Sequence, residues 1–501
     1  MTNAYTDHAQ TLTRRGALAG LAAGAGTVVL SAASAAPASS APASATERDA
    51  HGSAPAPAPD ASPTPGAMQL FTDPGLNFSA LLALGGAGFG AAEVGEVLTA
   101  VNAINAAGAS EQTYTAEFRR WGDRLTATVS PHERTHRAHS LRAAQYYGQA
   151  LFFVLGSQTP GDEKKLYLAG RRSWDTFARL CTPAAITGQV PYQGGVSIPV
   201  WFFRPDDSGR PRPTVILTNG SDGPNVDMWT YGVSAALARG WNALVYDGPG
   251  QGQLLFVDRL VFSPRWEQVV SPLVDWLERR GDVDARRIAL TGLSMGGDLA
   301  PRAAAFEHRI AALAALPGCL SPWLGFPAEL RDIVTPDKEE TNRVWNEEVA
   351  PGLTPSEQFV LKKRIEPFSI PAMLAARQGR LFTDFWTPAQ RIMALDITRI
   401  VGRIKCPTLV LDYDDETFYP GQPREFFELL RTRKEFRLMR AATGAQLHCS
   451  PMAPQQHCEV VFDWLEDTLG RVDRSWPASG QASPVRPVTG RTGPRGGFRR
   501  R

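Results

Sequence analysis

A serine flanked by glycines stands between a hydrophobic run and a helical pattern, and this junction constrains the fold more than any other part of the chain. Residues 288–291 form the hydrophobic run, and Gly292-Leu293-Ser294-Met295-Gly296-Gly297 follows it directly. In a G-x-S-x-G motif the serine occupies a strained strand-to-helix turn, where glycines avoid collisions with the neighbouring strand and helix. Such a turn lifts the Ser294 hydroxyl above a sheet, and the N–H of Met295 points toward a developing oxyanion. The motif therefore predicts a nucleophilic serine between a strand and a helix over residues 296–306.

Further hydrophobic runs predict that the strand before Ser294 belongs to a larger sheet. Continuous apolarity is typical of strands that are covered on both faces, and intervening stretches such as residues 263–280 have helical spacing. Residues 189–192 and 198–203 predict a pair of antiparallel strands. The remaining predicted strands comprise residues 214–218, 243–246, 288–291, 310–316, 408–411 and 436–439. We therefore expect an α/β fold with a doubly wound, mostly parallel sheet.

Two histidines lie late enough in the chain to serve as a base for Ser294. When the serine stands on such a turn, the acid and then the histidine follow it along the chain. His448 lies in the loop of residues 443–449, directly after the last predicted strand, from which its imidazole would reach the serine. His457 opens an amphipathic terminal helix and is better explained as a structural residue. We therefore predict that His448 is the general base.

The acid is expected in the loop after residues 408–411, where Asp412-Tyr413-Asp414-Asp415-Glu416 offers four carboxylates. The strand has to clear the sheet edge before a side chain can turn back toward the imidazole, which favours Asp415 or Glu416 over Asp412. Either acid would hold the histidine tautomer and stabilise the imidazolium. The residues alone leave the choice between Asp415 and Glu416 open.

The second oxyanion donor is expected in the loop after residues 214–218, which reads Asn219-Gly220-Ser221-Asp222-Gly223. A backbone N–H in this loop faces the serine turn when the strands are parallel neighbours. The N–H of Ser221 is the predicted donor, and the N–H of Gly220 is a second candidate. Together with Met295, this loop would stabilise the negative charge of a tetrahedral intermediate.

The chain resembles the α/β-hydrolase superfamily, because the serine turn is joined by further motifs. They are the loop of residues 219–223, Asp247-Gly248-Pro249-Gly250-Gln251-Gly252 and Phe418-Tyr419-Pro420-Gly421-Gln422. Over residues 116–469 the chain is similar to the subfamily that contains 2,6-dihydroxypseudooxynicotine hydrolase and the fungal heptaketide (pigment) hydrolases. The resemblance implies that Ser294 is the nucleophile, Glu416 the acid and His448 the base, although Asp415 is an extra acid beside Glu416. It also implies hydrolysis of an ester, an amide or a carbon–carbon bond next to a ketone.

The resemblance further implies helical caps around a hydrolase core. We expect a helical cap domain at residues 68–183, the core at residues 184–320 and 404–475, and a helical lid insertion at residues 321–403. Candidate packing residues of the cap are Trp121, Leu125, Leu141, Tyr147, Leu151 and Phe152. Most aromatic residues of the lid are expected in its core and some above Ser294 in a substrate pocket, and they are Trp323, Phe326, Trp345, Phe368, Phe382, Phe385 and Trp386.

Both ends of the chain differ in composition from the middle. Arg14-Arg15, a Gly/Ala-rich apolar run and Ala33-Ser34-Ala35 predict a twin-arginine-type signal peptide over residues 1–35. The protein is therefore expected to be exported and to be extracellular or associated with the bacterial cell envelope. The apolar run is too short and too rich in glycine for a stable membrane span. Residues 36–67 predict a disordered Ala/Pro/Ser linker, and residues 476–501 a disordered basic tail that would contact an anionic envelope weakly.

Composition narrows the class of protein further. A formal net charge of +2 among 501 residues argues against nucleic-acid binding, which normally leaves a strongly basic footprint. The five cysteines are too few and too scattered for a disulfide scaffold, and any pairing of Cys449 with Cys458 stays open. We expect a small-molecule carbonyl substrate and no cofactor, while the oligomeric state stays undetermined.

Two alternatives to a serine hydrolase follow from the residues. His132-Glu133-Arg134-Thr135-His136 fits H-E-x-x-H, which on a helix can hold zinc between two imidazoles. The surrounding Arg134, Arg137 and His139 are more typical of a solvated face, and no third ligand stands out, so we expect no metal. The other alternative is a secreted binding protein that keeps the fold without turnover.

Overall fold

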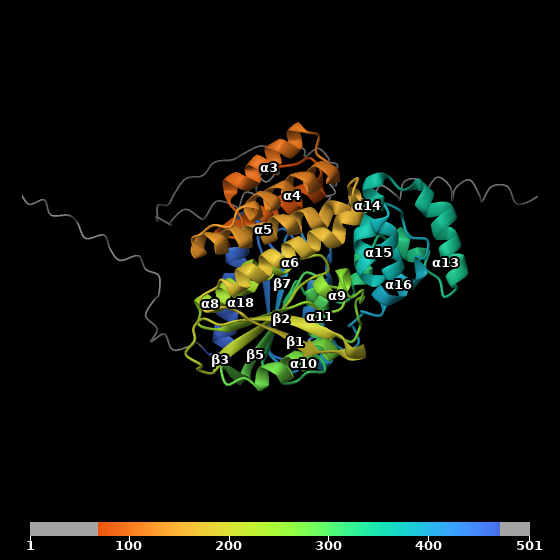
Figure 1. Ribbon diagram of the computed structural model, residues 1–501. Coiled ribbons are helices and arrows are strands. Elements are labelled where there is room, and N and C mark those ends of the chain that lie inside the picture. The colour runs from red at the N-terminus through yellow and green to blue at the C-terminus, as the bar shows by residue number, and fades with distance from the viewer. Residues whose placement is uncertain (1–68, 471–501) are drawn as a thin grey trace, which may run out of the picture.

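An eight-stranded sheet forms the centre of the computed structural model, which describes residues 69–470 (Figure 1). The strands lie in the order β1-β2-β4-β3-β5-β6-β7-β8. Their bounds are β1 Ile186–Pro191, β2 Ser197–Phe203, β3 Arg212–Thr218, β4 Asn242–Tyr246, β5 Val283–Leu293, β6 Ala312–Leu316, β7 Thr408–Tyr413 and β8 Lys434–Met439. β1 pairs with β2 and β2 with β4 in antiparallel fashion, and the other neighbours are parallel. The predicted mostly parallel α/β sheet is thereby confirmed.

Helices cover both faces of the sheet, as the continuous apolarity of its strands predicts. Successive residues of β3 enter different cores, because side chains alternate along a strand. Ile216 packs with α10 (Glu267–Glu278) and α11 (Gly296–Ala304), whereas its neighbours Val215 and Leu217 pack with α8 (Ser234–Ala238) and α18 (Pro454–Leu469). The other core helices are α7 Asn225–Met228, α9 Gly252–Phe256 and α17 Gln422–Leu429. β5 therefore ends, just before Ser294, inside a sheet that is held from both sides.

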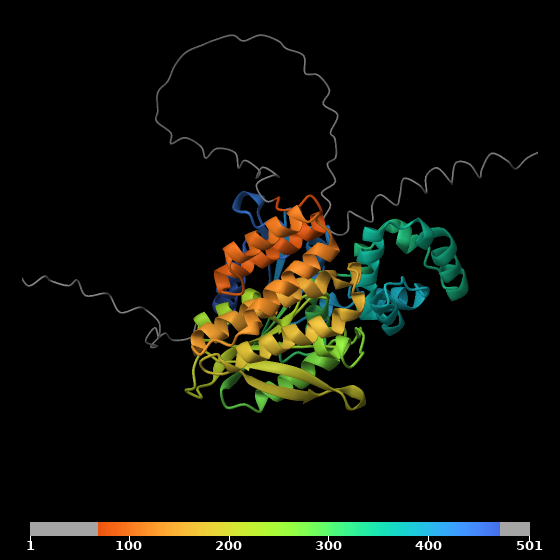
Figure 2. The same ribbon diagram turned by 45° about the horizontal axis from the view of Figure 1, so that its top comes forward.

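A group of helices precedes the sheet in the chain and lies above it in both ribbon views (Figures 1 and 2). These helices are α2 Pro74–Gly85, α3 Val94–Ala106, α4 Glu111–Ala127, α5 Glu133–Phe153 and α6 Glu163–Arg179. Of the expected packing residues Trp121, Leu141, Tyr147 and Leu151 are buried, while Leu125 and Phe152 are half-buried. The end of α2 touches the C-terminal part of the core, since a Cβ at Gly85 would lie 1.9 Å from the carbonyl oxygen of Pro451. Hereafter this group is called the cap.

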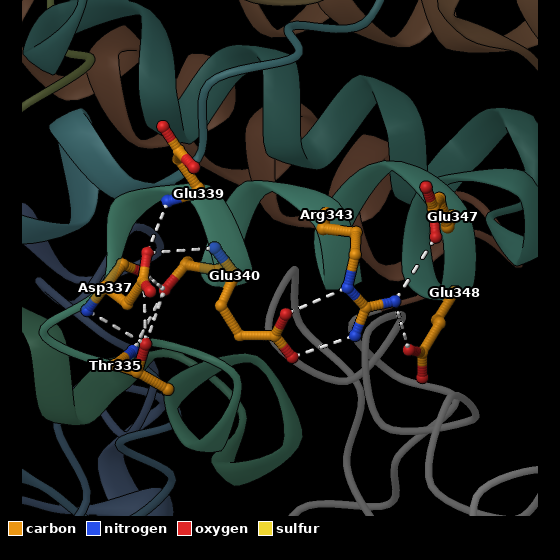
Figure 3. A network of polar contacts seen from close by, with 8 residues as sticks. Thr335, Asp337, Glu339, Glu340, Arg343, Glu347 and Glu348 are labelled. Carbon is orange, nitrogen blue, oxygen red and sulfur yellow. Dashed lines mark hydrogen bonds and ion pairs between the residues drawn. The ribbon is translucent and has the colours of Figure 1, made fainter.

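A second helical insertion, called the lid, separates β6 from β7 and lies beside the cap (Figure 2). Its helices are α12 Ala328–Asp332, α13 Lys338–Val344, α14 Pro355–Ile365, α15 Ile370–Arg377 and α16 Trp386–Met393. Figure 3 shows the start of α13, where the Asp337 carboxylate accepts hydrogen bonds from the N–H groups of Glu339 and Glu340. Arg343 pairs with Glu340 at 2.8 Å on the same helix. The Asp337 contacts cap the start of α13. Because the Arg343–Glu340 pair is largely exposed, it contributes little to overall stability.

Several predictions concern parts of the chain outside residues 69–470. They are the signal peptide, the linker and the basic tail, which therefore stay predictions. Within residues 69–470, no helix combines the length and the apolarity that crossing a membrane requires.

Candidate active site

Ser294 occupies a backbone conformation that only a few side chains tolerate. Its φ is +56°, in the left-handed region, which costs a non-glycine residue about 1–3 kcal/mol. The surrounding glycines make this turn fit between β5, α11 and the neighbouring strands. A Cβ added at Gly292 would lie 1.9 Å from the carbonyl oxygen of Gly296. A Cβ added at Gly297 would lie 1.8 Å from the carbonyl oxygen of Pro317. The motif thus has glycine where the backbone of neighbouring elements leaves no room for a side chain.

The structure brings Ser294, His448 and Glu416 into one hydrogen-bonded chain. The imidazole Nε2 of His448 lies 2.9 Å from the Ser294 hydroxyl, and its Nδ1 lies 2.7 Å from Glu416 Oε2. The other carboxylate oxygen of Glu416 accepts the N–H groups of Phe418 and Tyr419 at 2.7 and 3.0 Å. Both oxygens of Glu416 are therefore held, and the imidazole is oriented from its far side.

The other candidate acids and the second histidine lie elsewhere. Asp415 is exposed, and its backbone N–H donates to the Gln446 carbonyl in a bridge to Leu447. Between the two acids that the sequence leaves open, the structure thus brings Glu416 to the imidazole and not Asp415. His457 is fully buried within α18, and neither ring nitrogen has a hydrogen-bond partner among residues 69–470. Burial lowers the pKa of His457 to about 3, so it stays neutral inside the core.

The imidazole of His448 is enclosed by aromatic rings. The ring of Phe418 lies 4.3 Å from it, and Tyr419 meets it edge-on at 5.8 Å. Burial acts to lower the pKa of His448, but the neighbouring Cys449 and the Glu416 carboxylate outweigh it and raise the pKa above its ordinary value. The histidine is therefore held in a polar pair inside an otherwise apolar surrounding.

The loop after β3 lies directly against Ser294, with Gly220 closest. A Cβ at Gly220 would lie 2.8 Å from the Ser294 Cβ, so this position requires a glycine. The Gly220 N–H donates to the Asn219 side chain at 2.8 Å, which corrects its assignment as an oxyanion donor because the hydrogen is already engaged. The N–H groups of Ser221 and Met295 have no acceptor among residues 69–470. These two groups are therefore available to a ligand oxygen.

A cavity of about 200 Å³ opens at Ser294 and His448. Its walls come from the loop after β3, from cap helices α2 and α5, and from lid helix α14. Most of the exposed wall surface is apolar, and it includes Phe78, Leu82, Phe152, Phe153, Leu293, Phe359, Val360 and Phe418. Charged side chains also line the cavity, and they are Asp73, Glu111, Asp222, Asp227, Lys363 and Arg364. The size of the cavity suits a small organic ligand.

Of the seven aromatic residues named for the lid, most were expected in its core and some in the wall of a pocket above Ser294. None of them lines the cavity at Ser294. Trp345 instead stacks on Phe382 at 5.0 Å and on Phe385 at 4.9 Å, which forms a core inside the lid. The lid reaches the cavity through α14, whose Phe359 and Val360 were not predicted.

Polar residues of the cavity wall also carry no local sequence signal. Asp227, on α7, is 5% exposed, and burial raises its pKa to about 7 although the neighbouring Gln145 of the cap acts to lower it. Gln149, on α5, is 5% exposed as well. The one signal that could have identified Asp227 and Gln149 is that each is a polar residue on the buried face of a helix.

The H-E-x-x-H segment lies at the outer end of α5, away from the cavity. His132 and Glu133 are exposed, and His132 precedes the first turn of the helix. Residues 69–470 contain no group of three or more His, Cys, Asp or Glu side chains that could hold a metal ion. All five cysteines are free thiols.

Known proteins share this architecture along most of the chain. The profile of the alpha/beta hydrolase family matches residues 215–464. Hydrolase LUC6 of Fusarium sp. is 30% identical over 432 residues, which covers 80% of this chain and 98% of the fungal protein. The chain belongs to the alpha/beta hydrolase family. The match extends over nearly the whole length of LUC6.

Two further proteins agree with the assignment. The 20-hydroxy-prefusarin hydrolase FUS2 of Gibberella moniliformis is 32% identical to the hydrolase over 253 residues, covering 47% of this chain and 59% of FUS2. The crystal structure of 2,6-dihydroxy-pseudo-oxynicotine hydrolase aligns with a TM-score of 0.53 at 20% identity, over 77% of this chain and 95% of that one. The second likeness shows the fold alone. The predicted resemblance to these hydrolases is confirmed, and the protein is an enzyme of the hydrolase class.

Proposed function

We propose that this protein is an exported serine hydrolase that transfers an acyl group to water through Ser294, His448 and Glu416. The observation that carries the proposal is the continuous chain of hydrogen bonds, 2.9 Å from Ser294 to His448 and 2.7 Å from His448 to Glu416. A hydroxyl is a weak nucleophile unless an adjacent base removes its proton as it attacks. A histidine that is oriented by a buried carboxylate fulfils that requirement.

The proposed reaction begins when the Ser294 oxygen attacks a carbonyl carbon of the substrate. His448 takes the hydroxyl proton at Nε2, and Glu416 stabilises the resulting imidazolium through Nδ1. The N–H groups of Met295 and Ser221 then donate to the oxyanion of the tetrahedral intermediate. The imidazolium gives its proton to the leaving group, and water releases the acyl group by the same steps in reverse order.

An ester or an activated ketone is the proposed substrate, because the cavity is small and mostly apolar. In a β-diketone or an acyl-phenol the leaving atom is carbon, and the proton on His448 would pass to that carbon. The names of FUS2 and of the pseudo-oxynicotine hydrolase refer to small organic substrates of those proteins, in keeping with this class.

Labelling with a fluorophosphonate probe tests the nucleophile. We expect the wild-type protein to be labelled and Ser294→Ala to be silent, with Ser321→Ala as a control that loses a different serine. Wild-type protein that is folded but unlabelled would instead favour a binding protein on the same fold. Assays on p-nitrophenyl esters, matched amides and a β-diketone panel then separate the substrate classes.

Export is proposed from Arg14 and Arg15 in the N-terminal segment. Replacing both by lysine should retain the protein in the cytoplasm of a host with a twin-arginine system, since that route requires the arginine pair. Normal export of this double variant would contradict the proposed route.

A further inference from the structure

Two backbone carbonyls of the loop after β3 accept hydrogen bonds from one buried side chain. The amide nitrogen of Gln251 donates to the carbonyl oxygens of Asn219 and Gly220, at 2.8 Å each. The amide oxygen of Gln251 accepts the N–H of Gly248 at 3.1 Å, and the residue is 6% exposed. Because an amide nitrogen has two hydrogens, both are used to hold the loop that carries Ser221.

The glycine-rich motif of residues 247–252 places Gln251 beside this loop. The φ angles of Gly250 and Gly252 are +83° and +43°, in the region that favours glycine. A Cβ added at Gly250 would lie 2.5 Å from the ring of Phe262, so the turn leaves no room for a side chain there. The motif therefore has a fixed backbone path, which delivers the Gln251 side chain to one place.

The order of the strands puts Gln251 and Ser294 on opposite sides of the loop. β3 lies between β4 and β5 in the sheet, and Gln251 follows β4 whereas Ser294 follows β5. On the side of the serine turn the contacts are close. A Cβ at Gly220 would lie 2.8 Å from the Ser294 Cβ, and a Cβ at Gly296 would lie 2.6 Å from the Thr218 carbonyl oxygen. The loop after β3 is thus held between the Gln251 amide and the serine turn.

The geometry of one peptide group links the Gln251 contact to the oxyanion site. The carbonyl of Gly220 and the N–H of Ser221 belong to the same peptide group, which is trans. In a planar trans peptide these two groups point in opposite directions. Because the carbonyl points to Gln251, the Ser221 N–H points to the other side of the loop, where Ser294 lies. This N–H has no acceptor among residues 69–470, and Ser221 lines the cavity that contains Ser294.

We propose that Gln251 is a positioning residue, whose amide fixes the Gly220–Ser221 peptide so that the Ser221 N–H points at the oxyanion formed when Ser294 attacks. Gln251 is outside the wall of the Ser294 cavity, so it acts through the loop and not on the substrate. An oxyanion donor contributes most when negative charge develops in the transition state. This inference rests on the proposed serine hydrolase function and assigns a role to the motif of residues 247–252.

The first test replaces Gln251 by methionine, which has a similar volume and donates no hydrogen bond. A misplacement of about 1 Å in a catalytic group costs up to about 100-fold in rate. We therefore expect kcat on p-nitrophenyl butyrate to fall by about 10- to 100-fold, while KM changes by less than about threefold. Gln253→Met is the matched control, because Gln253 is on the same short helix and its side chain contacts Arg171 and Asp258. It should leave kcat within about threefold of the wild type.

A pair of inhibitors separates positioning of the oxyanion donor from general damage to the cavity. The carbonyl of 1,1,1-trifluoro-4-phenylbutan-2-one readily adds a serine hydroxyl and becomes an oxyanion, whereas 4-phenylbutan-2-one remains a ketone. Transition-state analogues bind a hydrolase more tightly than ground-state ligands, so the wild type should prefer the trifluoromethyl ketone. Gln251→Met should weaken the trifluoromethyl ketone by about 10- to 100-fold and the plain ketone by less than about threefold.

A thermal melt reports whether Gln251→Met is folded. If it is not, Gln251→Glu replaces it, because the carboxyl group retains an acceptor for the Gly248 N–H and donates at most one hydrogen bond. The same selective loss of the trifluoromethyl ketone is expected for Gln251→Glu.

Equal losses on both inhibitors in a folded Gln251 variant, or no loss on either, would overturn the inference while the wild type still prefers the trifluoromethyl ketone. Failure of the proposed function gives a different result. In that case the wild type would bind both inhibitors equally, and Ser294→Ala would hydrolyse the ester as fast as the wild type does.

Discussion

Replacing Glu416 by glutamine should remove most of the activity without removing a single buried contact. The backbone N–H groups of Phe418 and Tyr419 donate to Glu416 Oε1, and a glutamine oxygen accepts them equally well. The new amide nitrogen then takes the position of Oε2, 2.7 Å from His448 Nδ1. An amide nitrogen can only donate there, so Nδ1 has to accept and the ring proton moves to Nε2.

The imidazole would then present an N–H to the Ser294 hydroxyl, where a base is needed. In a serine triad the wrong tautomer lowers kcat by about 10⁴-fold, and we expect Glu416→Gln to lose about 10³- to 10⁴-fold. Asp415→Asn is the matched control, because Asp415 is the adjacent acid and is exposed. It should change kcat by less than about threefold, as a surface substitution usually does.

The assay is kcat on p-nitrophenyl butyrate, combined with the rate of fluorophosphonate labelling and a thermal melt of each variant. The melt separates loss of the tautomer from loss of the fold. A larger loss of kcat in Asp415→Asn than in Glu416→Gln, with both proteins folded, would refute the assignment of the acid.

Three other changes test separate parts of the site. His448 has to be neutral to take a proton, and its pKa is raised above the ordinary value of about 6.5. We therefore expect kcat/KM to rise with pH and to reach its midpoint above pH 6.5. A lower midpoint in the pH–rate profile would contradict this. His457→Phe should retain kcat within about threefold, because the buried ring has no polar partner among residues 69–470, and a loss comparable to that of His448→Ala would count against His448 as the base. Gly297→Ala should lower the free energy of unfolding by about 3 kcal/mol in a denaturant titration, since its Cβ would lie 1.8 Å from the Pro317 carbonyl oxygen. Gly281→Ala is the control for that titration and should be near neutral, because a Cβ there would meet no atom of residues 69–470 within 4 Å.

Local patterns were sufficient for the sheet and for the turn that carries Ser294. The runs that became β3, β4 and β7 are continuous and apolar because helices cover both their faces, and a buried strand needs no other signal. The glycines around Ser294 are required by backbone contacts that recur wherever a strand turns sharply into a helix. These features depend on residues that are close together in the sequence, and they can therefore be predicted from it.

Features that depend on how separate elements meet were not predictable in the same way. Asp415 and Glu416 are adjacent acids, and only the path of the chain after β7 decides which one turns toward the imidazole. The lid aromatics have the composition of a pocket lining but pack on one another, so Phe359 of α14 reaches the cavity and Trp345 does not. Gln251 belongs to a motif that the sequence shows, but its contact with the loop after β3 depends on the order of β4, β3 and β5.

The close approach of Gly85 to Pro451 has a consequence for protein engineering. The first cap helix contacts the segment that follows His448, and Phe78 of that helix also lies 5.9 Å from Phe418, whose ring faces the His448 imidazole. A chimaera in which the cap of a relative replaces this cap would thus also change the contacts that surround His448. Selectivity and turnover are coupled in this architecture, and altering one by such a graft will alter the other.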